Sequence, residues 1–285
     1  MTCDSNLKEA LSLLEGRFEE RSVVIGSHAV SYRSCGRGPV VVLLHGIGSG
    51  AASWLHCALL LEKDAQVIAW NAPGYGRSTP LSNAQPSAAD YALRLEEFLQ
   101  ALGVVDCLLV GHSLGAMMAS AYVAAGYGRA SRLLLVSPAQ GYGSDDKRVR
   151  GREIAKQRLD TLETLGVDGM AARAPARMLS AQADEVARIW VRWNMQWLNP
   201  KGYAQAVHML CGDDIHRYMP AGVPGAVVCG SADAVTTPQA SRALAEQFDF
   251  PFHLIDDAGH ACYIEQPGAA AAAIRQQLYK PAYTL

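Results

Sequence analysis

Short runs rich in Val, Ile and Leu alternate along the chain with segments of helical periodicity, and this alternation is the strongest constraint on the fold. A run that is apolar at every position is typical of a strand buried on both faces, as in a parallel sheet covered by helices. The expected strands are Val23–Ile25, Val30–Arg33, Val40–Leu44, Gln66–Trp70, Cys107–Val110, Arg132–Val136, Ala226–Cys229 and Phe252–Ile255. The first two form a hairpin around Gly26 and Ser27. The pattern predicts an α/β fold with a mostly parallel, doubly wound central sheet.

The rhythm of strands and helices breaks between residues 140 and 221, where the sequence is charged, helical in pattern and without a convincing strand. We interpret 140–221 as a helical insertion and 1–20 as an N-terminal helical extension. Residues 21–139 and 222–285 then form one core domain. A chain of 285 residues is long enough for such a domain with an insertion.

Composition excludes several classes of protein. Hydrophobic residues make up 50% of the chain and charged residues 18%, with a net charge of −2, which is unlike a disordered chain or a general nucleic-acid binder. No apolar run approaches the roughly 20 residues of a membrane span, and the N-terminal residues do not resemble a signal peptide. We therefore expect a cytoplasmic protein that binds neither nucleic acid nor membrane.

The 7 cysteines are odd in number and never spaced as Cys-x-x-Cys, so no disulfide framework is evident. His208, Cys211 and His216 lack a fourth ligand at zinc-site spacing. We expect no metal and no organic cofactor, and the sequence leaves the oligomeric state open.

The sharpest local motif is Gly111-His112-Ser113-Leu114-Gly115, which lies where an expected strand ends and a helix begins. A nucleophile on such a strained turn needs small neighbours two residues away on either side, and glycine meets that need here. The helix N-terminus favours negative charge that develops near Ser113. Ser113 is therefore the candidate nucleophile.

A serine hydroxyl needs a base and an orienting acid. His260 follows the last expected strand, at the end of the sheet where functional residues gather, and is the candidate base. Asp233 follows the preceding strand and is the candidate acid, favoured over Asp256 and Asp257, which suit a turn. His45 more simply shapes its own loop, and His112 should point away from its neighbour Ser113.

These motifs, together with Asn71–Ser78 and Glu265-Gln266-Pro267, resemble the α/β-hydrolase family over nearly the whole chain. The chain order Ser, Asp, His is that of the family. The resemblance implies a sheet of about eight strands, the triad Ser113, Asp233 and His260, and an oxyanion hole from the backbone N–H groups of Ile47 and Leu114. It also implies that the insertion 140–221 is a helical cap. Asn71 departs from the family, which usually has aspartate there, so the partners of that side chain are an open question.

A rival interpretation comes from Gly46–Ala51, which satisfies the Gly-x-Gly-x-x-Gly/Ala fingerprint of dinucleotide binding directly after a strand. That fingerprint needs an acidic residue about 20 positions later, at the end of the next strand. The strand ends instead in Trp70 and Asn71, which disfavours a dinucleotide.

The cap suggests how a substrate binds. Trp190, Trp193 and Trp197 share one helical face and could roof an apolar pocket, or could simply pack on the core. Arg192 could hold a carboxylate, although most arginines on such helices are solvated. We expect a small-molecule substrate with an apolar portion.

The expected activity is hydrolysis of a small to medium carboxylic ester, lactone or similar activated carbonyl compound through an acyl-enzyme. One alternative is hydrolysis of a carbon–carbon bond in vinylogous diketones, although the loop after His45 lacks the Gly-Pro-Gly of such relatives. Another is a small-molecule receptor with little turnover, because fold alone does not settle function.

Overall fold

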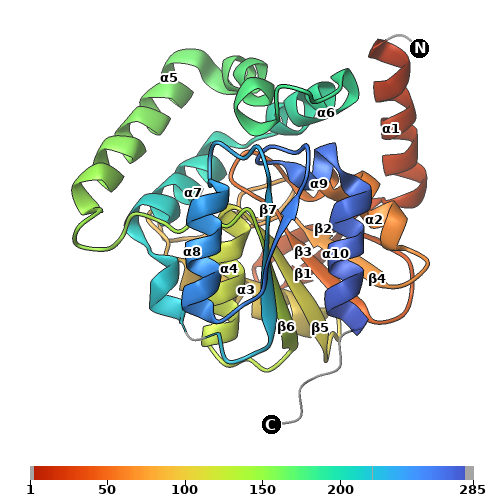
Figure 1. Cartoon of the computed structure of the whole chain (residues 1–285), viewed down its shortest axis with the longest axis horizontal. Coiled ribbons are helices and arrows are strands. Elements are labelled where there is room, and N and C mark those ends of the chain that lie inside the picture. Colours follow the sequence, from red (N-terminus) through yellow and green to blue (C-terminus); the bar gives the residue numbers. More distant parts are fainter. Residues whose placement is uncertain (1–2, 220, 280–285) are drawn as a thin grey trace.

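The computed structural model describes residues 3–219 and 221–279 and contains one 8-stranded sheet in the order β1-β2-β4-β3-β5-β6-β7-β8 (Figure 1). The strands are β1 (Glu20–Ile25), β2 (His28–Cys35), β3 (Val40–Leu44), β4 (Gln66–Trp70), β5 (Cys107–His112), β6 (Ala130–Val136), β7 (Gly225–Gly230) and β8 (Phe252–Ile255). β2 pairs antiparallel with β1 and β4, and every other pairing is parallel. The predicted fold class is confirmed.

Helices cover both faces of the sheet, with α3, α4 and α8 on one face and α2 and α10 on the other (Figure 1). The helices are α1 (Cys3–Arg17), α2 (Leu55–Leu61), α3 (Ala88–Ala101), α4 (Leu114–Ala124), α5 (Arg148–Met178), α6 (Glu185–Gln196), α7 (Pro200–Gly212), α8 (Pro238–Phe248), α9 (Cys262–Glu265) and α10 (Pro267–Tyr279), with short 3₁₀ turns η1 (Ala51–Trp54) and η2 (Ile215–Tyr218). β3 and β5 lie in the middle of the sheet and are almost wholly buried, which explains the apolar runs Val40–Leu44 and Cys107–Val110.

Between β6 and β7 the described residues form α5, α6, α7 and η2 and no strand, and α5 and α6 extend above the sheet (Figure 1). α5 contains a non-helical residue, Gly166, whose φ of 61° divides it into two helical pieces. The division into extension, core and cap stays a prediction, and its residues 1–2, 220 and 280–285 lie outside the described part of the chain.

Local sequence signals determine where helices begin and end. Ser87 and Asp90 form a reciprocal capping box at the start of α3, as their spacing predicts. Gly103 takes a φ of 69° just beyond the end of that helix, a conformation that glycine adopts without strain. Thr237 caps α8, with Pro238 as its first residue.

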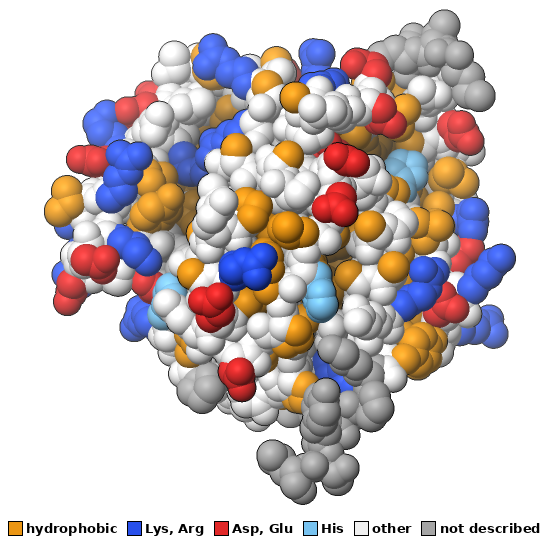
Figure 2. Space-filling model, in the orientation of Figure 1, with side chains coloured by type: hydrophobic (Ala, Val, Ile, Leu, Met, Phe, Trp, Pro, Cys, Tyr) orange, Lys and Arg blue, Asp and Glu red, His pale blue; other side chains and the backbone are white. Residues whose placement is uncertain are grey.

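The surface mixes charges of both signs. On the face shown in Figure 2, Lys and Arg side chains lie among Asp and Glu side chains. In the described part of the chain no helix is long and apolar enough to cross a membrane.

Asn71, at the end of β4, uses its whole amide group in the buried junction between the hairpin and the rest of the sheet. Its Oδ1 accepts a hydrogen bond from the Ala51 N–H at 2.8 Å. Its Nδ2 donates to Glu20 Oε1 at 3.0 Å and to Ser31 Oγ at 2.9 Å. Asn71 therefore donates to the carboxylate of Glu20, which an aspartate at position 71 could not do while ionised.

We predict that Asn71→Asp destabilises the fold by about 1–3 kcal/mol at neutral pH, because a carboxylate would face Glu20 without a proton to donate. Urea unfolding at pH 7 measures the loss. Adding Glu20→Gln restores a donor opposite the new carboxylate, so the double variant should recover part of the stability. Equal stability of Asn71→Asp and wild type would contradict this account of the junction.

Candidate active site

Ser113 lies on a sharp turn between β5 and α4, with φ 52° and ψ −115°. Such a backbone is strained for any residue with a side chain and persists only when its surroundings hold it. The two flanking glycines allow the turn: a Cβ at Gly111 would lie 2.4 Å from the Gly115 carbonyl oxygen, and one at Gly115 would lie 2.6 Å from the Leu44 carbonyl oxygen. No larger residue fits either position, so the motif is a steric requirement of the turn.

The structure brings the three predicted residues into one hydrogen-bonded chain. His260 Nε2 lies 2.9 Å from Ser113 Oγ, and His260 Nδ1 lies 2.9 Å from Asp233 Oδ2. All three residues are buried, with exposures of 6% for Ser113, 2% for His260 and 3% for Asp233. Asp233 follows β7 and His260 follows β8, so both come from the carboxyl end of the sheet. This geometry is that of a nucleophile, a base and an orienting acid.

Asp233 is held as a carboxylate. Burial raises its pKa, but the hydrogen bond and charge of His260 and the backbone N–H groups of Thr236 and Val235 outweigh that effect and hold the pKa of Asp233 well below its ordinary value. Its Oδ1 accepts from these two N–H groups at 2.9 and 2.7 Å. An ionised carboxylate in this position selects the His260 tautomer with a proton on Nδ1, which leaves Nε2 free to accept the Ser113 proton.

Thr236 is a site residue that sequence reasoning missed. Its hydroxyl lies 2.9 Å from Asp233 Oδ2, 3.1 Å from His260 Nδ1 and 3.0 Å from the Ser137 carbonyl oxygen. The only sequence signal was its place three residues after Asp233, where short polar side chains commonly complete a turn. Its contact with His260 follows from tertiary structure alone.

The rival histidines have structural positions. His45 Nδ1 hydrogen-bonds the Gly46 carbonyl oxygen at 2.8 Å, and its Nε2 accepts from the Ala72 N–H at 3.0 Å, so it shapes its own loop as expected. His112 turns away from Ser113 and contacts the His260 carbonyl oxygen through Nε2 at 3.0 Å. Asp257 has a φ of 52°, in keeping with a turn.

The two expected oxyanion donors lie on segments that meet at Ser113. In the described part of the chain, no backbone hydrogen bond to a backbone acceptor outside the regular elements comes from the N–H of Ile47 or Leu114. The loop that contains Ile47 packs closely against Ser113, because a Cβ at Gly46 would lie 3.1 Å from Ser113 Cβ. Tyr75 holds the loop by donating its hydroxyl proton to the Ile47 carbonyl oxygen at 2.9 Å. Among the described residues, neither N–H group is therefore committed to such a backbone bond.

The same loop is a poor dinucleotide site. The Ala51 N–H, at the end of the Gly46–Ala51 fingerprint, is already bonded to Asn71, and Asn71 stands where the fingerprint needs an acid. A Cβ at Gly48 would lie 2.6 Å from Met195 Cε, so a helix of the insertion covers the loop.

Trp190 and Trp193 lie on α6 and Trp197 follows its last residue, and the exposure of the three side chains differs along this stripe. Trp190 is buried, stacks on Trp193 with ring centroids 4.9 Å apart and lies 5.9 Å from the His56 ring. Trp197 is 68% exposed and Arg192 is exposed, so neither is enclosed in a pocket. Met195 of α6 reaches residues 46–50, which we call the oxyanion loop after the expected donor Ile47, and sequence reasoning did not single out Met195. Helical periodicity identified the apolar face without showing which of its residues faces the site.

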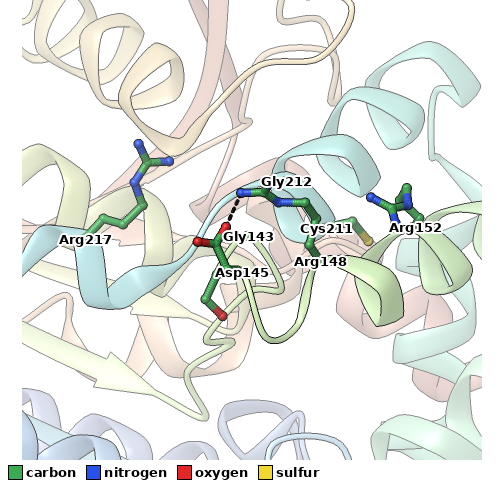
Figure 3. Close-up of a pocket in the computed structure, with 8 residues that line it drawn as sticks. Gly143, Asp145, Arg148, Arg152, Cys211, Gly212 and Arg217 are labelled. Atoms are coloured by element: carbon green, nitrogen blue, oxygen red, sulfur yellow. Dashed lines mark hydrogen bonds and ion pairs between the residues drawn. The ribbon is translucent and has the colours of Figure 1, made fainter.

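A surface cavity of about 630 Å³ lies elsewhere, where the loop before α5 meets the end of α7 (Figure 3). Arg148, Arg152 and Arg217 line it, and Arg148 is paired there with Asp145. None of the candidate catalytic residues lines this cavity. Among the described residues no group of three or more His, Cys, Asp or Glu side chains could hold a metal ion.

Comparison with known proteins identifies the family of the chain. Residues 41–274 match the sequence profile of the Alpha/beta hydrolase family. RutD of Shigella flexneri serotype 5b, a candidate carbamate hydrolase, is 30% identical over 243 residues, which cover 80% of this chain and 87% of RutD. The chain belongs to the α/β-hydrolase family and is a hydrolase.

Solved structures share the fold. An esterase from Thermogutta terrifontis superposes with a TM-score of 0.79 at 24% identity, covering 91% of this chain and 98% of the esterase. The enol-lactonase from Burkholderia xenovorans LB400 superposes with a TM-score of 0.81 at 21% identity, covering 91% of this chain and 100% of the lactonase. At these identities the likeness is one of fold.

Two buried neutral histidines predict acid sensitivity. Burial lowers the pKa of His45 to about 4, although its hydrogen bond to Gly46 acts in the opposite direction, and burial lowers the pKa of His112 to about 3. Each group stays neutral in the folded protein while the unfolded chain takes up a proton below about pH 6.5. Their contribution to stability is therefore complete above pH 6.5 and is lost as the pH falls toward 4.

We predict that His45→Gln lowers the slope of unfolding free energy against pH between 4 and 6.5 by about 1.4 kcal/mol per pH unit, which corresponds to one proton. Urea titrations at several pH values measure the slope. His253→Gln, on exposed β8, is the control. An unchanged slope in His45→Gln would show that His45 is not the titrating group.

Proposed function

We propose that the protein is a serine hydrolase that cleaves small to medium carboxylic esters, lactones or similar activated carbonyl compounds through an acyl-enzyme. The observation that carries the proposal is the hydrogen-bonded chain from Ser113 through His260 to Asp233, with the serine on a strained turn. A buried serine with a hydrogen-bonded base and a charged acid behind it is the arrangement that activates a hydroxyl nucleophile.

In the first half of the reaction, Ser113 Oγ attacks the carbonyl carbon and its proton passes to His260 Nε2. The carbonyl oxygen becomes an oxyanion that accepts hydrogen bonds from the N–H groups of Ile47 and Leu114. Asp233 stabilises the imidazolium. When the tetrahedral intermediate collapses, the bond to the leaving oxygen breaks, that oxygen takes the proton from His260, and an ester of Ser113 remains.

In the second half, His260 takes a proton from water as the water oxygen attacks the acyl carbon. Collapse of this second intermediate breaks the bond to Ser113 Oγ, which recovers the proton from His260, and the carboxylic acid leaves. Neither half requires a metal or an organic cofactor.

The surroundings of Ser113 favour a substrate that is small and partly apolar. Ser113 and His260 are almost inaccessible, and Met195 packs on the oxyanion loop beside Ile47. Apolar walls with a few placed polar groups are usual in such ligand sites. We propose that the segment 140–221 serves as the cap that encloses the substrate.

A carbamate is the second candidate substrate, because RutD, at 30% identity, is a candidate carbamate hydrolase. The same residues would act: Ser113 would attack the carbamate carbonyl and the leaving group would depart with the His260 proton. The two substrate classes differ in what leaves and in what remains on the serine, so parallel assays distinguish them.

We predict that a fluorophosphonate probe labels the wild type and that Ser113→Ala abolishes labelling and lowers ester turnover by about 10⁴-fold or more. Purified proteins are labelled and then assayed with p-nitrophenyl esters of increasing chain length and with an aryl carbamate. The matched control is Ser120→Ala, a buried serine on the same helix whose hydroxyl has no hydrogen-bond partner among the described residues.

Each outcome decides between the candidates. Labelling and turnover that vanish only in Ser113→Ala support the proposal, and the preferred probe gives the substrate class. Turnover of vinylogous diketones in place of esters would favour carbon–carbon bond hydrolysis. Tight ligand binding by a folded wild type that neither labels nor turns over would favour a receptor and contradict the proposal.

A further inference from the structure

The main chain around His260 is held from two sides. On the sheet side, His112 Nε2 lies 3.0 Å from the His260 carbonyl oxygen. On the other side, the N–H of Gly259 donates to Glu265 Oε2 at 2.6 Å, and the N–H of Ala261 donates to the Met178 carbonyl oxygen at 2.8 Å. The position of the His260 ring therefore depends on groups outside the hydrogen-bonded chain that it forms with Ser113 and Asp233.

Glu265 also bonds to the inserted helices. Its carboxylate accepts the N–H of Ser180 at 3.0 and 3.1 Å and the hydroxyl of Ser180 at 2.6 Å. Ser180 is 4% exposed and lies in the joint between α5, which ends at Met178, and α6, which begins at Glu185. One carboxylate thus joins the residue before His260 to this α5–α6 joint.

The two segments also touch directly. A Cβ at Gly259 would lie 2.6 Å from the Leu179 carbonyl carbon and from the Ser180 nitrogen, so the His260 loop and the joint pack backbone against backbone. Beyond the joint, α6 places Met195 on the oxyanion loop. The α5–α6 joint therefore contacts the His260 loop and leads directly into the helix that reaches the oxyanion loop.

We propose that Glu265 is a positioning residue that ties His260 to the α5–α6 joint, so that the base reaches Ser113 only when the inserted helices are docked. This inference rests on the proposed function, since it assigns His260 the role of base. Four N–H and O–H interactions converge on one carboxylate, a group with capacity for all of them and no proton to offer.

Glu265→Gln tests the link without changing the size of the side chain. An amide has one acceptor oxygen and no negative charge. With nitrogen in place of Oε2 the bond from the Gly259 N–H is lost, and with oxygen there the N–H groups of Gly259 and Ser180 bond to a neutral acceptor, so the link is weakened in either orientation. Ser180→Ala removes only the hydroxyl on the joint. The control is Asp184→Ala, which removes the side-chain cap of α6 within the same insertion and has no hydrogen bond to the His260 loop among the described residues.

The readouts are the second-order rate of labelling by a small fluorophosphonate, kcat and KM for a p-nitrophenyl ester, and the downfield NMR resonance of the His260 Nδ1 proton. We expect Glu265→Gln to lower the labelling rate and kcat by about 10-fold with little change in KM, because small displacements of a catalytic group are costly. Ser180→Ala should lower them by about 3-fold and Asp184→Ala by less than about 2-fold. The double variant Glu265→Gln/Ser180→Ala should match Glu265→Gln, because both changes break the same link.

A folded Glu265→Gln that labels at the wild-type rate would overturn the proposal. The proposal would also be overturned if the fold-decrease in labelling rate of the double variant equalled the product of the decreases in Glu265→Gln and Ser180→Ala. If Glu265→Gln does not fold, an unchanged labelling rate in Ser180→Ala overturns it. If the wild type does not label at all, the proposed function fails, but the NMR resonance of the His260 Nδ1 proton still tests the link through Glu265. This resonance should shift in Glu265→Gln or, if that variant does not fold, in Ser180→Ala. An unchanged resonance in the folded variant would overturn the link.

Discussion

The strained turn at Ser113 is the constraint on which the rest of the structure depends. Its φ of 52° is held by the Ser113 N–H, which bonds to the Val136 carbonyl oxygen at 2.9 Å, and by the Ser113 carbonyl oxygen, which accepts from Ala116 and Ala139 at 3.0 and 3.1 Å. These bonds connect β5, β6 and α4. Because Gly115 lets α4 approach the end of β3 closely, the same turn brings the oxyanion loop against the serine. The positions of the candidate nucleophile and of its expected donors therefore follow from one local geometry.

Most of the sheet could be predicted because its central strands are largely buried and carry long apolar runs. β3 and β4 begin and end where the sequence pattern places them. The bounds of the hairpin strands were harder to predict from the sequence. The pattern predicted a strand over Val30–Arg33, whereas β2 extends over His28–Cys35. Its polar residues find partners far along the chain, such as Ser31, which bonds to Asn71, and no sequence window contains such a pairing.

Candidate site residues were predictable where position along a strand determines their place. Asp233 and His260 each follow a parallel strand, so the sheet itself carries them to Ser113. Thr236, Glu265 and Met195 could not be found in this way, because their roles arise from contacts between segments distant in sequence. Helical periodicity has a further limit as a predictor. In the stripe Trp190–Trp197, a period of 3.6 residues defines a helix face but does not show which part of the protein that face covers.

Enclosure of the site has opposing effects on catalysis. Burial of His260 and Asp233 removes water that would weaken their interaction, which strengthens the carboxylate as a partner for an imidazolium. The same burial leaves Ser113 only 6% exposed, so in the proposed function a substrate would displace part of the proposed cap, residues 140–221, to reach it. A cover that moves independently of the base would leave a reactive serine exposed to water at each opening. Under the proposed link, a base anchored to this cap through Glu265 would lose its alignment when the cap opens, so the serine would be activated only with a substrate enclosed.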